Sequence, residues 1–155
     1  MSDKAKLCIL LPGIIALGFL RDYLFINVNW VTLTMTTGRR LQARHEFYFL
    51  LDWPQNQLII LKWLLTFIFF FLFLAVTRWI IQVLYKNRFY NQITIIVFLG
   101  IMGISGVLYI IGLLSPTLYD NFYGTIINLM HLTQSFIPLL ILIIVFKFLP
   151  DSQND

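Results

Sequence analysis

The sequence predicts an all-α integral membrane protein, a single domain of four transmembrane helices with a long first extramembrane loop. Of its 155 residues 59% are hydrophobic and only 12% are charged, whereas a soluble domain carries about 25% charged residues. Four apolar stretches each reach the roughly 20 residues that a helix needs to cross a bilayer. No stretch alternates like a strand of a membrane barrel, and a helix satisfies its own backbone groups in hydrocarbon, so we expect helices throughout.

The four spans are separated by polar or helix-ending residues. A short turn, Lys86-Asn87-Arg88, makes the second and third spans antiparallel neighbours. Ser115-Pro116 ends the third, because the residue before a proline is pushed out of the helical region. An even number of spans places both chain ends on one side of the membrane. The predicted spans cover residues 6–28, 58–85, 92–114 and 125–148.

The loop of residues 29–57 divides into two parts. From Val31 to Thr36 apolar residues alternate with threonines, which is the period of a strand and equally fits an extended loop. The part that follows joins basic residues to the aromatic run Phe47-Tyr48-Phe49, a combination typical of an element lying on lipid headgroups. We therefore predict a partly interfacial loop. Its basic residues are Arg39, Arg40, Arg44 and His45.

Polar residues inside two of the spans form the candidate site. Arg21 and Asp22 interrupt the first span about 22 Å from its start at Lys6, at about 1.5 Å per residue. On the fourth span Asn128, His131 and Ser135 share one helix face. Polar faces of membrane helices point into the bundle or toward a partner. We expect one intramembrane polar cluster, which fits a lipid, quinone or substrate headgroup site, a packed structural cluster, or a contact with another protein.

Small residues recur on the third span at Gly100, Gly103 and Gly106. Small side chains let helices approach closely in lipid, where packing replaces the hydrophobic drive. We predict helix packing through these glycines, within the chain or against another subunit.

The residues indicate no catalytic set, cofactor or metal. Zinc needs three or four ligands, and His45, Glu46 and His131 are too few. The carboxylates lie far apart in sequence, the serines lack a nucleophile elbow, and the single cysteine excludes an internal disulfide. The formal net charge of +4 is scattered between apolar runs, so nucleic acid is not an expected partner. We expect a protein that is not an enzyme, with the lipid bilayer as its surroundings.

Two segments resemble a known family. Phe19 to Phe25 at the end of the first span and His131 to Leu140 in the last span resemble the small hydrophobic proteins associated with the F-type exosortase of Bacteroidota-like bacteria. The resemblance implies an accessory protein beside a membrane protein-sorting enzyme, in a bacterial inner membrane. The basic turn after the second span favours cytoplasmic chain ends.

Two functions follow as hypotheses. The first is a non-catalytic accessory subunit of a larger membrane protein complex, linked to protein sorting or export. The second is a small membrane-embedded binder or transporter of a lipid, quinone or other small ligand, using the polar cluster.

Overall fold

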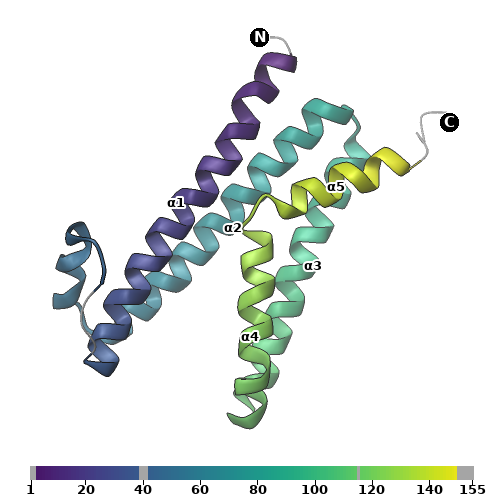
Figure 1. Cartoon of the computed structure of the whole chain (residues 1–155). Helices are drawn as coiled ribbons and strands as arrows, with labels where there is room; N and C mark the ends of the chain where they lie inside the picture. Colours follow the sequence, from purple (N-terminus) through teal and green to yellow (C-terminus); the bar gives the residue numbers. More distant parts are fainter. Residues whose placement is uncertain (1–2, 39–41, 115, 150–155) are drawn as a thin grey trace.

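The computed structural model describes residues 3–38, 42–114 and 116–149, with side chains described outside 116–121. Within these ranges the chain is helical and contains no strand. The elements are α1 (Asp3–Thr37), the 3₁₀ helix η1 (His45–Asp52), α2 (Gln55–Tyr85), α3 (Arg88–Leu113), α4 (Pro116–Thr133) and α5 (Ile137–Phe148). Figure 1 shows α1 beside α2 and α3 beside α4, with the two pairs diverging toward one end of the molecule.

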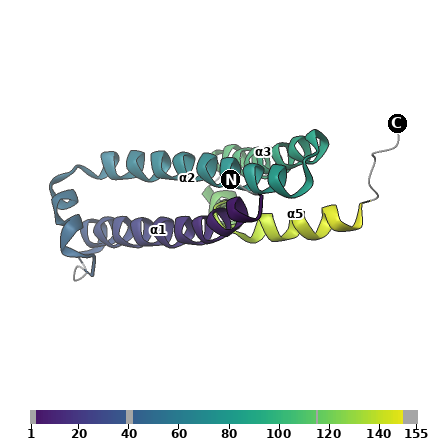
Figure 2. The same cartoon turned by 90° about the horizontal axis from the view of Figure 1, so that it is seen from above.

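Within the part of the chain that the structure describes, three helices are long and apolar enough to cross a membrane, namely α1, α2 and α3. Residues Phe122–Thr133 of α4 and helix α5 pass the same test only together, and they are bent by 67° relative to each other. Figure 2 shows α5 running away from the α4 axis. The predicted fourth span, 125–148, is therefore a broken helix pair, and its helical part begins earlier, at Pro116.

The break after Thr133 has a local cause. The Thr133 and Ser135 hydroxyls donate to backbone carbonyls three residues earlier. Pro138 lies in the first turn of α5, where its missing N–H is tolerated. Inside a continuous helix the same proline would lose a hydrogen bond and clash with the preceding turn. The prediction that Ser135 continues the helical face of Asn128 and His131 is thus wrong in geometry, since Ser135 lies in the break.

The strand-like reading of residues 31–36 is also wrong, because α1 continues to Thr37. The hydroxyls of Thr32, Thr34 and Thr37 each donate to a carbonyl four residues earlier, which makes the threonines compatible with a helix. Val28 and Val31 are buried against Leu50 and Leu58. Burial against η1 and α2 therefore favours a helix in this segment, despite the alternating pattern that is typical of a strand.

The turn after α2 follows the prediction. Lys86 takes the left-handed conformation, with φ of 52°, and ends α2. Asn87 caps α3 by accepting a hydrogen bond from the Phe89 N–H at 2.9 Å. Ring contact between Trp63 and Tyr109, with centroids 5.4 Å apart, shows that α2 and α3 stay adjacent far from the turn.

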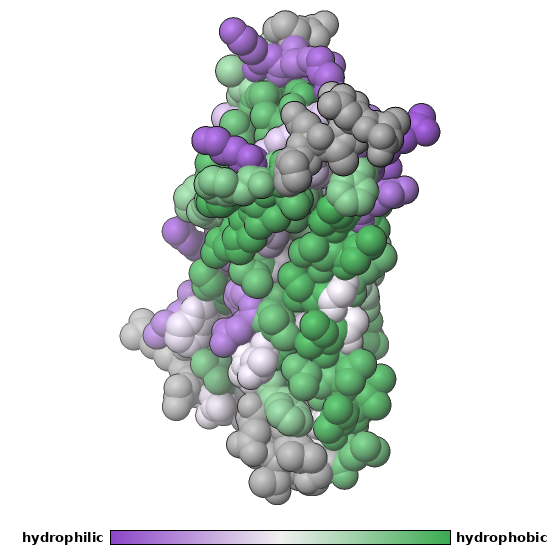
Figure 3. Space-filling view, turned by 90° about the vertical axis from the view of Figure 1, so that its right-hand side faces the viewer, coloured by the Kyte–Doolittle hydropathy of each residue, from purple (hydrophilic) through white to green (hydrophobic). Residues whose placement is uncertain are grey.

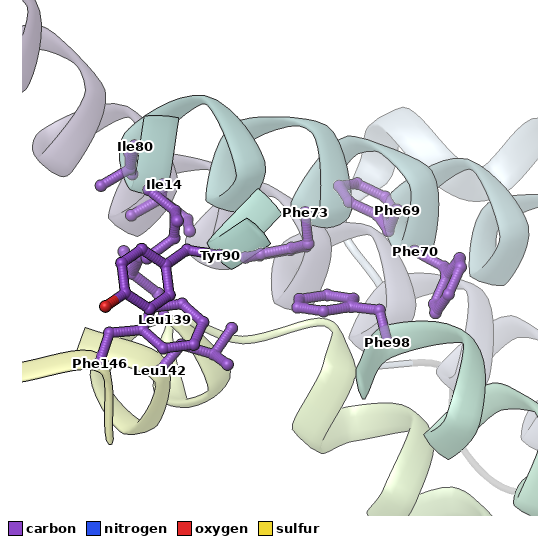
Figure 4. Close-up of a cluster of buried hydrophobic side chains, with 11 residues drawn as sticks. Ile14, Phe69, Phe70, Phe73, Ile80, Tyr90, Phe98, Leu139, Leu142 and Phe146 are labelled. Carbon is purple, nitrogen blue, oxygen red and sulfur yellow. The ribbon is translucent and has the colours of Figure 1, made fainter. Parts of the chain in front are cut away.

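The main apolar core lies where α1, α2, α3 and α5 meet (Figure 4). The Tyr90 and Phe146 rings pack with centroids 4.5 Å apart. The Tyr85 hydroxyl donates to the Ile143 carbonyl at 2.9 Å and joins the end of α2 to α5. This core holds α5 beside the α2–α3 turn, so the start of α1 and the end of α5 lie toward the same end of the molecule (Figure 1). Its buried members are Ile14, Phe69, Phe70, Phe73, Ile80, Ile81, Tyr90, Phe98, Leu139, Leu142 and Phe146.

The outer surface is largely apolar. Figure 3 shows hydrophobic residues covering most of the face that carries α3, α4 and α5, with hydrophilic residues toward the upper end and a further hydrophilic group lower on the left. Many large apolar side chains are exposed, among them Ile96, Ile104 and Ile110 along α3. This surface suits a hydrocarbon environment.

Candidate functional site

The Arg21 side chain is the buried centre of the candidate site. It lies near the middle of α1 and is 5% exposed. Its Nη1 donates to the Asp22 Oδ1 at 2.6 Å. Its guanidinium carbon lies 4.9 Å from the centre of the Phe25 ring, within the range of a cation–π contact. Arg21 therefore supplies a charged hydrogen-bond donor to Asp22.

Gln134 connects this ion pair to two other parts of the chain. Its Oε1 accepts from the Arg21 Nε at 3.2 Å, and its Nε2 donates to the Thr66 carbonyl of α2 at 3.0 Å. The side chain is 2% exposed, and both ends of its amide are used. One hydrogen-bonded chain thus runs from Asp22 on α1 through the α4–α5 break to α2.

Gln134 is not among the site residues that the sequence predicts. In a continuous fourth span, position 134 would lie about 60° around the helix from His131, at the edge of the face formed by Asn128, His131 and Ser135. The break turns Gln134 inward toward α1 and α2. The available signal was a long amide side chain four residues before a proline in an otherwise apolar segment.

A groove of about 440 Å³ lies between the middle of α1 and the α4–α5 break. It brings together all five predicted cluster residues, although the three from the fourth span make no described hydrogen bond to Arg21 or Asp22. Asn128 and His131 are exposed and Ser135 is half-buried. The groove is lined by Ile15, Gly18, Phe19, Arg21, Asp22, Asn128, His131, Leu132, Gln134, Ser135, Phe136 and Ile137.

The two members of the ion pair differ sharply in exposure. The side chain of Arg21 is 6% exposed and that of Asp22 is 58% exposed. The guanidinium is turned toward the protein, while the carboxylate stands at the open side of the groove. An incoming group therefore meets a hydrogen-bond acceptor with negative charge, beside the Asn128 amide and the His131 imidazole.

The predicted interfacial loop is described from residue 42 onward, so Arg39 and Arg40 lie outside the described residues. Arg44 and His45 are exposed beside η1, whose Leu50 is buried against α1 and α2. The buried Asn27 accepts a hydrogen bond from the Arg44 N–H at 2.7 Å, which fastens the segment to α1. Tyr48 and Phe49 remain exposed. The segment has the short helix and exposed aromatics that the interfacial prediction requires, and it lies beside α1 rather than beyond its end (Figure 1).

The three predicted packing glycines do not pack within the described chain. Gly100, Gly103 and Gly106 are exposed on α3, and beyond their chain neighbours and the nearby backbone of α3 no atom lies within 4 Å of where a side-chain Cβ would stand. Packing inside the described chain is therefore excluded as their role. The helix interface of α3 instead uses residues such as Phe98 and the buried Ser105.

The arrangement offers groups that can bind through hydrogen bonds and charge. Among the described side chains, no three of His, Cys, Asp or Glu gather where they could hold a metal ion. Cys8 is exposed on α1, away from the groove. At its surface the groove offers one carboxylate, one amide and one imidazole, from Asp22, Asn128 and His131.

Comparison with models of protein families, with curated proteins and with solved structures found no match to this chain.

Proposed function

We propose that the protein is an integral membrane protein that crosses a bacterial inner membrane four times, with the bent α4–α5 pair as the fourth crossing and both ends cytoplasmic. Three helices of sufficient length and apolarity support this, as does the apolar outer surface. Helix α1 measures about 52 Å, well beyond a hydrocarbon core of about 30 Å, so part of it extends into the headgroups or beyond.

Within that membrane the protein acts as a non-catalytic accessory subunit that docks a larger membrane protein through the groove. The observation that carries this proposal is the exposure of Asp22, Asn128 and His131 on otherwise apolar helices. Placing an ionised side chain at the centre of a bilayer costs about 2.5–3.5 kcal/mol on insertion scales. Only Arg21 satisfies Asp22 within the described chain. A second membrane protein covering the groove would remove the remaining cost.

The resemblance of two segments to exosortase-associated proteins makes a membrane protein-sorting enzyme the first partner to test. Binding of a small amphipathic ligand is the second candidate, favoured by the lining of the groove. Phe19 and Phe136 provide exposed aromatic surface next to the polar residues, as a quinone or lipid site would require.

Site-specific photocrosslinking in native membranes distinguishes the two candidates. A photoreactive residue is introduced at Phe19, which is 73% exposed in the groove, and at Ile96, which is 67% exposed on α3, as the control. The accessory function predicts a discrete adduct with one membrane protein from position 19 and none from position 96. An adduct with a lipid or quinone only would favour the second candidate. Equal, diffuse labelling from both positions would contradict both.

A further inference from the structure

We propose that the groove recognises a basic side chain, lysine or arginine, presented within the bilayer by a transmembrane helix of the partner subunit. This inference rests on the accessory function proposed above and specifies its chemistry. It follows from the direction in which the Arg21–Asp22 pair faces.

The first step concerns charge. Asp22 is the exposed member of the pair, and Arg21 has its Nε and Nη1 directed to Gln134 and Asp22. A carboxylate can accept several hydrogen bonds through its two oxygens, and the described chain supplies one donor. At the open side of the groove, the Asp22 carboxylate can therefore accept further hydrogen bonds. A charged donor would form a stronger hydrogen bond there than a neutral one.

The second step concerns the surroundings of Asp22. Phe19 lies one helical turn before it on the same wall of the groove and exposes an aromatic face to which a cation is attracted. Helix α4 ends and α5 begins at this place, so the negative end of one helix dipole adjoins the positive end of the other. The electrostatic contributions of the two helix ends offset each other. The charged side chains therefore determine the sign of the electrostatic potential in the groove.

The third step concerns the alternatives. A phosphate or carboxylate entering the groove would meet the Asp22 carboxylate, while the cation that could attract it lies behind. Anionic lipid headgroups therefore fit this groove poorly. A basic residue in the membrane segment of another protein is itself costly in lipid, and pairing with Asp22 relieves both chains at once.

The test measures how much partner stays bound to the full-length protein during purification in mild detergent. The partner is the protein crosslinked from position 19. Asp22→Asn removes the charge while keeping the size, and Asp22→Glu keeps the charge. We expect Asp22→Asn to lower partner retention at least about tenfold, which corresponds to the loss of about 1.4 kcal/mol, and Asp22→Glu to retain most of it. Glu46→Gln, on the exposed surface of η1, is the matched control and should bind as wild type does.

A reciprocal change in the partner makes the test independent of the folding of Asp22 variants. Replacing the crosslinked helix's lysine or arginine with glutamine should lower retention of the wild-type protein to the same degree. Exchanging the charges, with D22K against aspartate in the partner, should restore it. A crosslinked helix without a basic residue, or full retention by Asp22→Asn, would overturn the inference while leaving the accessory function intact. Absence of any protein adduct would instead overturn the accessory function on which the inference rests.

Discussion

The two charged clusters of α1 have the same chemistry in opposite surroundings: Lys6, Asp3 and Lys86 at its start, and Arg21 with Asp22 near its middle. Asp3, in the first turn, lies 2.7 Å from the Lys86 ammonium and 3.2 Å from that of Lys6, and none of the three side chains is buried. Arg21, near the middle of the helix, is buried between α1, α2 and the α4–α5 break. An exposed pair exchanges water for a partner with little net gain. A buried arginine has lost its water and depends on every hydrogen bond it makes.

The comparison shows where the polar groups of this protein matter for folding. The cluster at the start of α1 lies at the end of the molecule that carries the α2–α3 turn. Water can hydrate its charged groups if one of its members is removed. The Arg21 cluster lies among apolar helices and joins three segments far apart in the sequence. We expect substitutions in the Arg21 cluster to destabilise the protein most, and substitutions in the cluster at the start of α1 to destabilise it least.

Arg21→Ala should have the largest effect. It removes the buried donor of both Asp22 and Gln134 and leaves an uncompensated carboxylate. Breaking a buried pair costs about 3–5 kcal/mol, and the exposure of Asp22 places this case near the lower end of that range. The free energy of unfolding, measured by denaturant titration in mixed micelles, should fall by about 3 kcal/mol. Arg78→Ala, at an exposed position of α2, is the control. Equal losses from the two variants would show that the Arg21 cluster contributes nothing special.

Gln134→Ala should come second. The Arg21 Nε would lose its partner while remaining in a water-poor site. The Thr66 carbonyl would lose its second hydrogen bond and keep the one it accepts within α2. An unsatisfied buried group costs about 1–3 kcal/mol, and more when it is charged. Gln92→Ala, on the exposed surface of α3, provides the comparison. A loss confined to the Gln92 variant would mean that the described hydrogen-bonded chain does not exist in solution.

Asn27→Ala should have a smaller and more local effect. The Asn27 Oδ1 holds the Arg44 N–H, and without it η1 loses a hydrogen bond to α1 while its contact through Leu50 remains. We expect faster amide hydrogen exchange in residues 44–52 and little change in α2 and α3. Asn29→Ala, two residues on and exposed, should leave exchange unaltered. Uniformly faster exchange would argue that Asn27 supports the whole fold instead.

The smallest effect is expected for Asp3→Asn. Asp3 raises the pKa of Lys86 through a hydrogen bond and charge attraction. Because a raised pKa stabilises the protonated form, this contribution is complete below the ordinary value of 10.5 and disappears as the pH rises through the raised pKa. Wild type and Asp3→Asn should therefore differ slightly in unfolding temperature at neutral pH and low salt, and converge in strong alkali or high salt. A difference that grows with pH would contradict this assignment.

Local patterns predicted most of the elements because each depends on neighbours in sequence. Apolar stretches of spanning length identified α2 and α3 nearly to their ends, and the Lys86-Asn87-Arg88 turn followed from its own residues. The end of α3 before Pro116 followed in the same way. The threonine-rich end of α1 escaped this reasoning, since its conformation depends on burial of Val28 and Val31 against η1 and α2.

The candidate site could likewise be predicted only in part from the sequence. The sequence alone indicated that polar residues of two spans would share a site, because polar and charged groups in apolar helices need partners. Only the tertiary structure showed that α4 and α5 are bent by 67° and that Gln134 reaches both Arg21 and Thr66. It alone determined that Arg21 faces inward and Asp22 outward. The sequence states which side chain each position carries. The exposure of that side chain depends on which helices cover it, because segments far apart in the sequence pack against each other.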